Sequence, residues 1–141
     1  MLTLLAALSL WSGVPVHCSA QPLPIPKAIA VYDQTHPSIY LSQPVCDRLE
    51  AIRAGMRPRS QFTQRDFAES VWVMAHEYAR AHGINDQPAS NCAGLTYFAD
   101  LTKRLGVGSN YTRTLYGYAE AQLFGPCRAV GQKAWDQLPT S

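Results

Sequence analysis

The chain has 141 residues, a formal net charge of +2 at pH 7 and a hydrophobic content of 47%. This length predicts a single domain, and so many hydrophobic residues favour a folded core over a disordered chain. The sequence contains no long run of basic residues, so nucleic acid is not indicated as a partner.

Residues 1–20 are mostly apolar and contain no Asp, Glu, Lys or Arg. Their apolar part is shorter than the about 20 residues that a membrane-spanning helix needs. The small residue Ala20, just before Gln21, suits a signal-peptidase cleavage site. We therefore predict a signal peptide over residues 1–20 and a secreted or extracytoplasmic protein. The alternative is an uncleaved N-terminal anchor, which is the only route by which we expect the chain to meet a membrane.

Residues 21–27 are rich in Pro and predict an extended spacer ahead of one helical domain over residues 28–141. Within that domain, residues 28–32 and 38–41 have the composition of short strands. The fold class that we predict is mainly α, with about four helices and at most a short two-stranded β element. The helices are expected over residues 42–55, 63–83, 88–105 and, with Ser109 or Asn110 as the cap, 109–123.

The clearest of these helices extends from Thr63 to Gly83. Thr63 and Asp66 have the spacing of an approximate capping box, and Gly83 can end the helix in the left-handed conformation. The stretch between them contains no Pro and no internal Gly. Its apolar face is built from residues at helical intervals, which are Phe67, Val71, Met74, Ala75, Tyr78, Ala79 and His82.

This helix also carries the residues that most suggest chemistry, namely His76, Glu77, Arg80 and His82. A zinc peptidase of the HExxH type needs a His one turn after the first, with Glu as the general base. Here Arg80 stands in the second His position. His82 lies roughly 120° around the helix from His76 and about 9 Å along its axis, so the two imidazoles cannot bind one zinc ion.

The stretch VWVMAHEYARAHGINDQPASNCAGL, residues 71–95, resembles small exported bacterial proteins of a zincin-like, HExxH-type metallopeptidase family. In that family the pattern is roughly HExxHxxGxxDE, followed by a few small residues and an acid beside a Cys. The residues that match this pattern are His76, Glu77, Gly83, Asp86 and Cys92. The residues that depart from it are Arg80, Gln87 and Asn91.

All three departures fall on positions that the resemblance assigns to the metal site. Arg80 offers only hydrogen-bond donors and a permanent positive charge, while Gln87 and Asn91 lack the charge of Glu and Asp. The resemblance therefore implies a zincin-like scaffold with a degenerate site, in which Arg80 replaces the metal. In that interpretation Arg80 pairs with Glu77 and with the amide oxygens of Gln87 and Asn91.

Two other interpretations of the cluster stay open. In the simplest, His76 is partly buried and Glu77 is exposed to solvent on an ordinary helix. In the other, the protein is a working zinc peptidase, with Glu77 as the catalytic base and His76 as a metal ligand. That enzyme would need further ligands, such as His36 or Asp86. Without them we expect no cofactor.

The four cysteines are Cys18, Cys46, Cys92 and Cys127. If the signal peptide is removed, three remain, and an oxidising compartment favours one disulfide and one free thiol. We predict the pair Cys46–Cys92, because both residues lie in predicted helices. The alternatives are Cys92–Cys127 and three buried free thiols.

The surface offers two features for binding. Trp72 lies off the apolar face of its helix and is the aromatic residue that we expect to be exposed. Lys103, Arg104 and Arg113 flank the start of the last predicted helix and form a basic patch. The prediction is therefore a non-catalytic exported domain that binds a protein or an envelope component, with a zinc metallopeptidase as the alternative.

Overall fold

A computed structural model describes residues 2–19, 29–59, 62–84 and 87–123, and for residues 87–91 and 122–123 it describes the backbone alone. The helices and strands are α1 (Leu4–Ser12), β1 (Val16–Ser19), β2 (Ala30–Asp33), β3 (Ser38–Ser42), α2 (Gln43–Arg53), α3 (Gln64–Ala81), α4 (Gln87–Thr96), α5 (Phe98–Arg104) and α6 (Ser109–Tyr118). A π-helical turn, Ala119–Leu123, directly continues α6.

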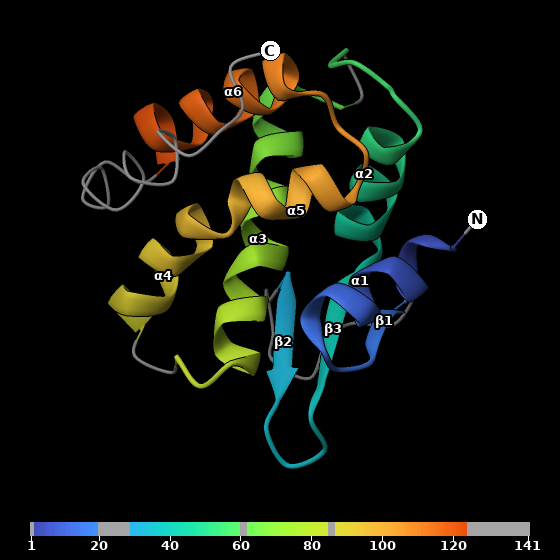
Figure 1. Ribbon diagram of the computed structural model, residues 1–141, viewed down its shortest axis with the longest axis vertical. Coiled ribbons are helices and arrows are strands. Elements are labelled where there is room, and N and C mark those ends of the chain that lie inside the picture. Colours follow the sequence, from blue (N-terminus) through green and yellow to red (C-terminus); the bar gives the residue numbers. More distant parts are fainter. Residues whose placement is uncertain (1, 20–28, 60–61, 85–86, 124–141) are drawn as a thin grey trace.

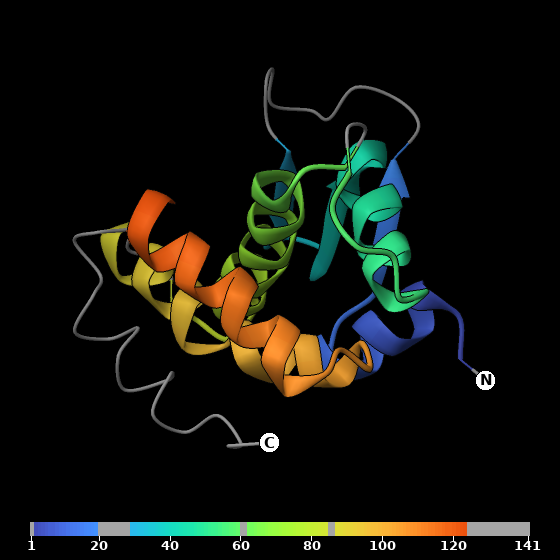
Figure 2. The same ribbon diagram turned by 90° about the horizontal axis from the view of Figure 1, so that it is seen from above.

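Helix α3 is the centre of the molecule (Figure 1). It contacts β2 and β3 of the sheet as well as α2, α4, α5 and α6. In a view turned by 90°, α4 and α6 lie on one side of α3 and α2 lies on the other (Figure 2). A helix surrounded in this way must bury more than one face, which decides the environment of its polar side chains.

The strands form one mixed sheet in the order β1-β3-β2. Strand β2 is antiparallel to β3, with Tyr32 opposite Ile39, and β1 is parallel to β3, with Val16 also opposite Ile39. The two strands predicted from the sequence are therefore present. The predicted fold class is nevertheless wrong, because the sheet has a third strand and the helices number more than four among the described residues.

The additional strand and helix come from the segment that we predicted to be a signal peptide. The hydroxyl of Thr3 accepts a hydrogen bond from the backbone N–H of Ala6, at 3.1 Å, and caps α1. Gly13 ends α1 at φ 80°, in the left-handed region. Five apolar side chains of this segment are buried in the core, and they are Leu4, Ala7, Leu8, Trp11 and Val16. Residues 4–19 are thus built into the fold.

Helix α2 lies within the range 42–55 that was predicted for it, with Pro44 in its first turn and Gly55 in the left-handed conformation at φ 87° just after its end. Its N-cap residue is Ser42, whose side chain makes no capping hydrogen bond. Its hydroxyl oxygen is buried without a hydrogen-bond partner among the described residues. The helix therefore begins because of the proline and the packing of its apolar side chains.

The single helix predicted over residues 88–105 is two helices, α4 and α5, which meet at Tyr97. Tyr97 has φ −93° and ψ 0°, outside the regular helical values. The side-chain hydroxyl of Thr96 donates to the carbonyl of Cys92 at 3.5 Å, an arrangement that bends helices. No Pro lies at this break, and the nearest Gly is Gly94, three residues before it.

The C-terminal helix also differs in its ends from the prediction. Its N-cap is Gly108, and Ser109 is its first residue. The tail after residue 123, including Cys127, lies outside the described residues, and so does the predicted spacer over residues 21–27.

The hydrophobic core collects large side chains from every layer of the fold. Those that are fully buried include Leu8, Ile39, Leu41, Leu49, Phe67, Met74, Leu95, Phe98, Leu101, Leu115 and Tyr116. None of the helices that the structure describes is long and apolar enough to span a membrane.

Candidate functional site

Helix α3 holds the candidate residues in place, and its start is fixed by a complete capping box. The backbone N–H of Asp66 donates to the Thr63 hydroxyl at 3.1 Å, and the backbone N–H of Thr63 donates to the Asp66 carboxylate at 3.0 Å. Arg48 on α2 lies 3.4 Å from the same carboxylate. The predicted helix from Thr63 to Gly83 is thus confirmed.

This capping box gives a first testable prediction. Burial raises the pKa of Asp66, but the hydrogen bonds from Thr63 and the charges of Arg48 and Arg65 together outweigh it, so the pKa lies below its usual value of 3.8. The stabilisation is therefore present above pH 3.8 and is lost as the pH falls through the lowered pKa.

We expect Asp66→Ala to lower the free energy of unfolding by about 1 kcal/mol at neutral pH. Urea unfolding at a series of pH values should show this difference shrinking toward zero in acid. A difference that stayed constant down to low pH would show that the ionised carboxylate contributes nothing.

His76 and Glu77 contact each other near the middle of the molecule. The ring Nδ1 of His76 lies 3.2 Å from Glu77 Oε1 and donates to it. His76 is only 6% exposed and Glu77 only 3%. The expectation that Glu77 is solvated is therefore wrong. Its second oxygen, Oε2, is also buried and has no hydrogen-bond partner among the described residues.

Of the contacts that the resemblance implied for Arg80, only the pair with Glu77 lies between described side chains. None of the ion pairs between described side chains joins Arg80 to Glu77. The Nε atom of Arg80 is buried without a hydrogen-bond partner in the same part of the chain. The side chains of Gln87 and Asn91 and the whole of Asp86 lie outside the described residues, so those predicted contacts stay predictions.

The described residues alone do not bring together a full set of zinc ligands. Zinc requires three or four protein ligands, and no group of three or more His, Cys, Asp or Glu side chains suited to a metal occurs among the described residues. The imidazole of His76 and the carboxylate of Glu77 interact with each other. His36 lies exposed in the turn between β2 and β3, next to Asp33.

Trp72 lies against His76, with ring centroids 5.0 Å apart. It is partly buried against the core, so it is not the freely exposed aromatic that we expected. Gly94 on α4 faces the indole so closely that an added Cβ would lie 2.6 Å from Trp72 Nε1. This contact joins α3 to α4 and covers His76.

We therefore expect Gly94→Ala to destabilise the protein by about 1–3 kcal/mol, because the added methyl group overpacks the indole. Gly117→Ala in α6 is the matched control, since its Cβ would meet nothing within 4 Å. That variant should gain about 0.5–1 kcal/mol from replacing a helical glycine. Chemical denaturation of both variants measures the difference. Equal stabilisation of the two would contradict the close contact at Trp72.

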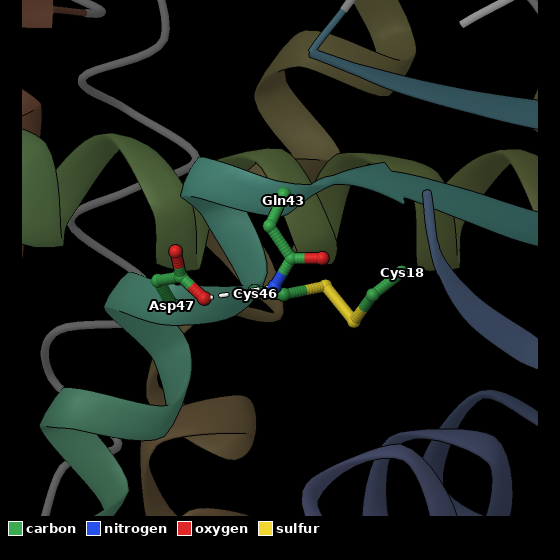
Figure 3. Close-up of a disulfide and its surroundings, with 4 residues drawn as sticks. All are labelled: Cys18, Gln43, Cys46 and Asp47. Atoms are coloured by element: carbon green, nitrogen blue, oxygen red, sulfur yellow. Dashed lines mark hydrogen bonds between the residues drawn. A yellow bond between two sulfur atoms is a disulfide. The ribbon is translucent and has the colours of Figure 1, made fainter. Parts of the chain in front are cut away.

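The described disulfide joins Cys18 to Cys46, with their Cα atoms 6.1 Å apart (Figure 3). The predicted pair Cys46–Cys92 is therefore wrong. Strand β1 pairs with β3, and β3 continues directly into α2, so Cys18 is brought to the first turn of α2. Cys92 is disulfide-bonded as well, and no described cysteine is free. The pair Cys92–Cys127 stays a prediction.

A second group of side chains, which sequence reasoning missed, connects α1 to α3 and α5. Trp11 stacks on Tyr78 with ring centroids 4.2 Å apart, and Tyr78 stacks on His82 at 4.2 Å. The indole N–H of Trp11 donates to Asp100 Oδ2 at 2.7 Å, and His82 Nε2 donates to the Ser12 carbonyl at 3.0 Å. His82 is thus engaged with α1 through its Nε2.

A cavity of about 380 Å³ lies beside this group, and the described residues that line it are Asp100, Lys103 and Arg104. Lys103 and Arg104 belong to the basic patch predicted from the sequence. The role of Asp100 was not predicted, because its hydrogen bond to Trp11 joins residues that lie 89 positions apart in the sequence. The only local signal was an acidic residue one turn before two cations on the same helix.

The fold is thus a small helical domain built on a mixed three-stranded sheet. Comparisons with protein-family models, with curated proteins and with solved structures find no match to this chain. The resemblance of residues 71–95 to zincin-like proteins accordingly stays a prediction.

Proposed function

We propose that the protein is an extracytoplasmic, disulfide-bonded domain that binds a protein or an envelope component and does not catalyse hydrolysis at His76 and Glu77. The observation that carries this proposal is the mutual contact of His76 and Glu77 inside the protein, where both are less than 10% exposed. A general base must reach the water or substrate from which it takes a proton.

The chemistry of the neighbouring residues supports the same conclusion. A catalytic zinc ion needs three protein ligands and an open position. The position of the second His is taken by Arg80, which carries a permanent positive charge and cannot donate a lone pair. The ring of Trp72 further separates His76 from solvent.

The proposed location rests on the disulfide chemistry. Disulfides form and persist in oxidising compartments and are rare in the cytosol. Cys18–Cys46 ties an N-terminal strand to α2, and Cys92 is disulfide-bonded too. Covalent links of this kind are useful to a small domain that has left the reducing interior of the cell.

Metal content of the purified protein is the decisive measurement, by elemental analysis before and after incubation with zinc. We expect no stoichiometric zinc in either sample, and no peptidase activity that Glu77→Gln abolishes. One zinc ion per chain that is lost in His76→Ala but kept in the surface control His36→Ala would overturn the proposal. The zinc peptidase would then be the function to pursue.

A further inference from the structure

We infer that the cavity lined by Asp100, Lys103 and Arg104 is a binding site for a phosphate group, either free or carried by a lipid headgroup. The inference rests on the proposed binding function and names the site and the ligand chemistry for it. Its volume of about 380 Å³ lies at the lower end of the range for small-ligand sites.

The charges around the cavity favour an anion. Lys103 and Arg104 are exposed, and no ion pair between described side chains involves either of them. Cations in the last turn of a helix also stabilise its dipole. Stabilisation of the helix dipole accounts for the presence of Lys103 and Arg104 on α5. It leaves the positive charges of both side chains available to a ligand.

Asp100 offsets only one of these two charges, and its Oδ2 is held toward Trp11 by the hydrogen bond from the indole N–H at 2.7 Å. Trp11 is itself 7% exposed and is held by its stack on Tyr78. One wall of the cavity is therefore fixed by a buried side chain. Two cations facing one engaged carboxylate leave a positive site, and a doubly charged phosphate matches the Lys–Arg pair better than a single carboxylate does.

The hydrogen bond between Trp11 and Asp100 also supplies a local reporter. A ligand that enters the cavity changes the field at Asp100 and with it the chemical shift of the Trp11 indole N–H. The indole of Trp72 lies against His76 and Gly94, and Trp72 is not among the described residues that line the cavity. Its signal should therefore stay in place while that of Trp11 moves.

The test is an NMR titration of the full ¹⁵N-labelled chain with inorganic phosphate at constant ionic strength. We expect a saturable shift of the Trp11 indole signal, with a Kd on the order of 1 mM, weakened at least about tenfold in the double variant Lys103→Ala/Arg104→Ala. Arg65→Ala removes the same kind of charge from an exposed site on α3 and should leave the titration unchanged.

Vesicles with and without phosphatidic acid distinguish the two sources of the phosphate. Sedimentation with the anionic vesicles alone, lost in the double variant, assigns the site to a headgroup, and a phosphate shift without sedimentation assigns it to a free phosphate. Absence of both, or a shift that the double variant retains, overturns the inference. Such a failure leaves the non-catalytic function standing, whereas one zinc ion per chain would overturn that function whatever the titration shows.

Discussion

A chain that lacks residues 1–20 is expected not to reach the native fold. The deletion removes α1, strand β1 and the disulfide partner of Cys46. It also removes five buried apolar side chains, and burial of each Leu or Val contributes about 1.5–3 kcal/mol. The whole stability of a domain of this size is only about 5–15 kcal/mol, so the sum of these losses is comparable with it.

A single substitution tests the same point without shortening the chain. Leu8 is fully buried, whereas Leu10 on the same helix is 69% exposed. Leu8→Ala should lower the free energy of unfolding by about 2–5 kcal/mol. Leu10→Ala should change it by less than about 0.5 kcal/mol. Thermal and urea unfolding of the pair measures both values.

Intact mass of the protein purified from its producing cells completes this test. We expect residues 4–19 to be present in the mature, folded protein. A stable and cooperatively folding protein that begins at Gln21 and lacks the earlier residues would show that α1 and β1 are dispensable. The original prediction of a removable signal peptide over residues 1–20 would then be correct.

The second large effect is expected at the Cys18–Cys46 disulfide. Its cysteines are separated by 28 residues, a loop length for which the chain-entropy model gives about 3–4 kcal/mol. The double variant Cys18→Ser/Cys46→Ser should therefore be destabilised by about that amount under non-reducing conditions. Replacing both cysteines together avoids leaving a free thiol that could exchange with the disulfide of Cys92.

Peptide mapping without reduction checks the pairing directly, because trypsin places each cysteine on a different peptide. These peptides are residues 1–27, 28–48, 81–103 and 114–128. We expect the first two to be linked to each other. We also expect 81–103 to be linked to 114–128, as the pair Cys92–Cys127 requires. A link between 28–48 and 81–103 would contradict the structure and restore the pair predicted from sequence.

Local signals explain what could be predicted from the sequence. Helix α3 has its caps and its apolar period within one stretch, so its existence and ends follow from residues near each other in the chain. The hairpin of β2 and β3 is likewise local. The break between α4 and α5 has no such signal, because it depends on the conformation of Tyr97 in the folded chain.

The packing of the N-terminal segment into the core was not predicted, because an apolar run without charges has the same composition whether it is exported and removed or buried. Residues 4–12 end in Gly13 and are followed by a strand whose partner, β3, lies more than 20 residues further along the chain. Composition cannot reveal that pairing. The disulfide prediction failed for the same reason, since Cys18 had been assigned to the removed segment.

The residues of the candidate site were identified by their motif, but the burial of their side chains was not predicted. Glu77 lies off the apolar face of α3 and was expected in water. Because α3 is covered by helices and strands on several sides, its buried residues extend beyond that face to Ser70, Val73 and Glu77. The burial of Glu77 depends on the position of α3 within the fold, and the periodic pattern of the sequence gives no information about that position.

The Cys18–Cys46 bond closes the backbone from residue 18 to residue 46 into a covalent ring. A protease that cuts once between β1 and β2 would open this ring without dividing the molecule. The nicked protein would keep its mass apart from one added water, and only reduction would release the α1–β1 piece. The domain can therefore be cut once at this point and still remain one covalent molecule.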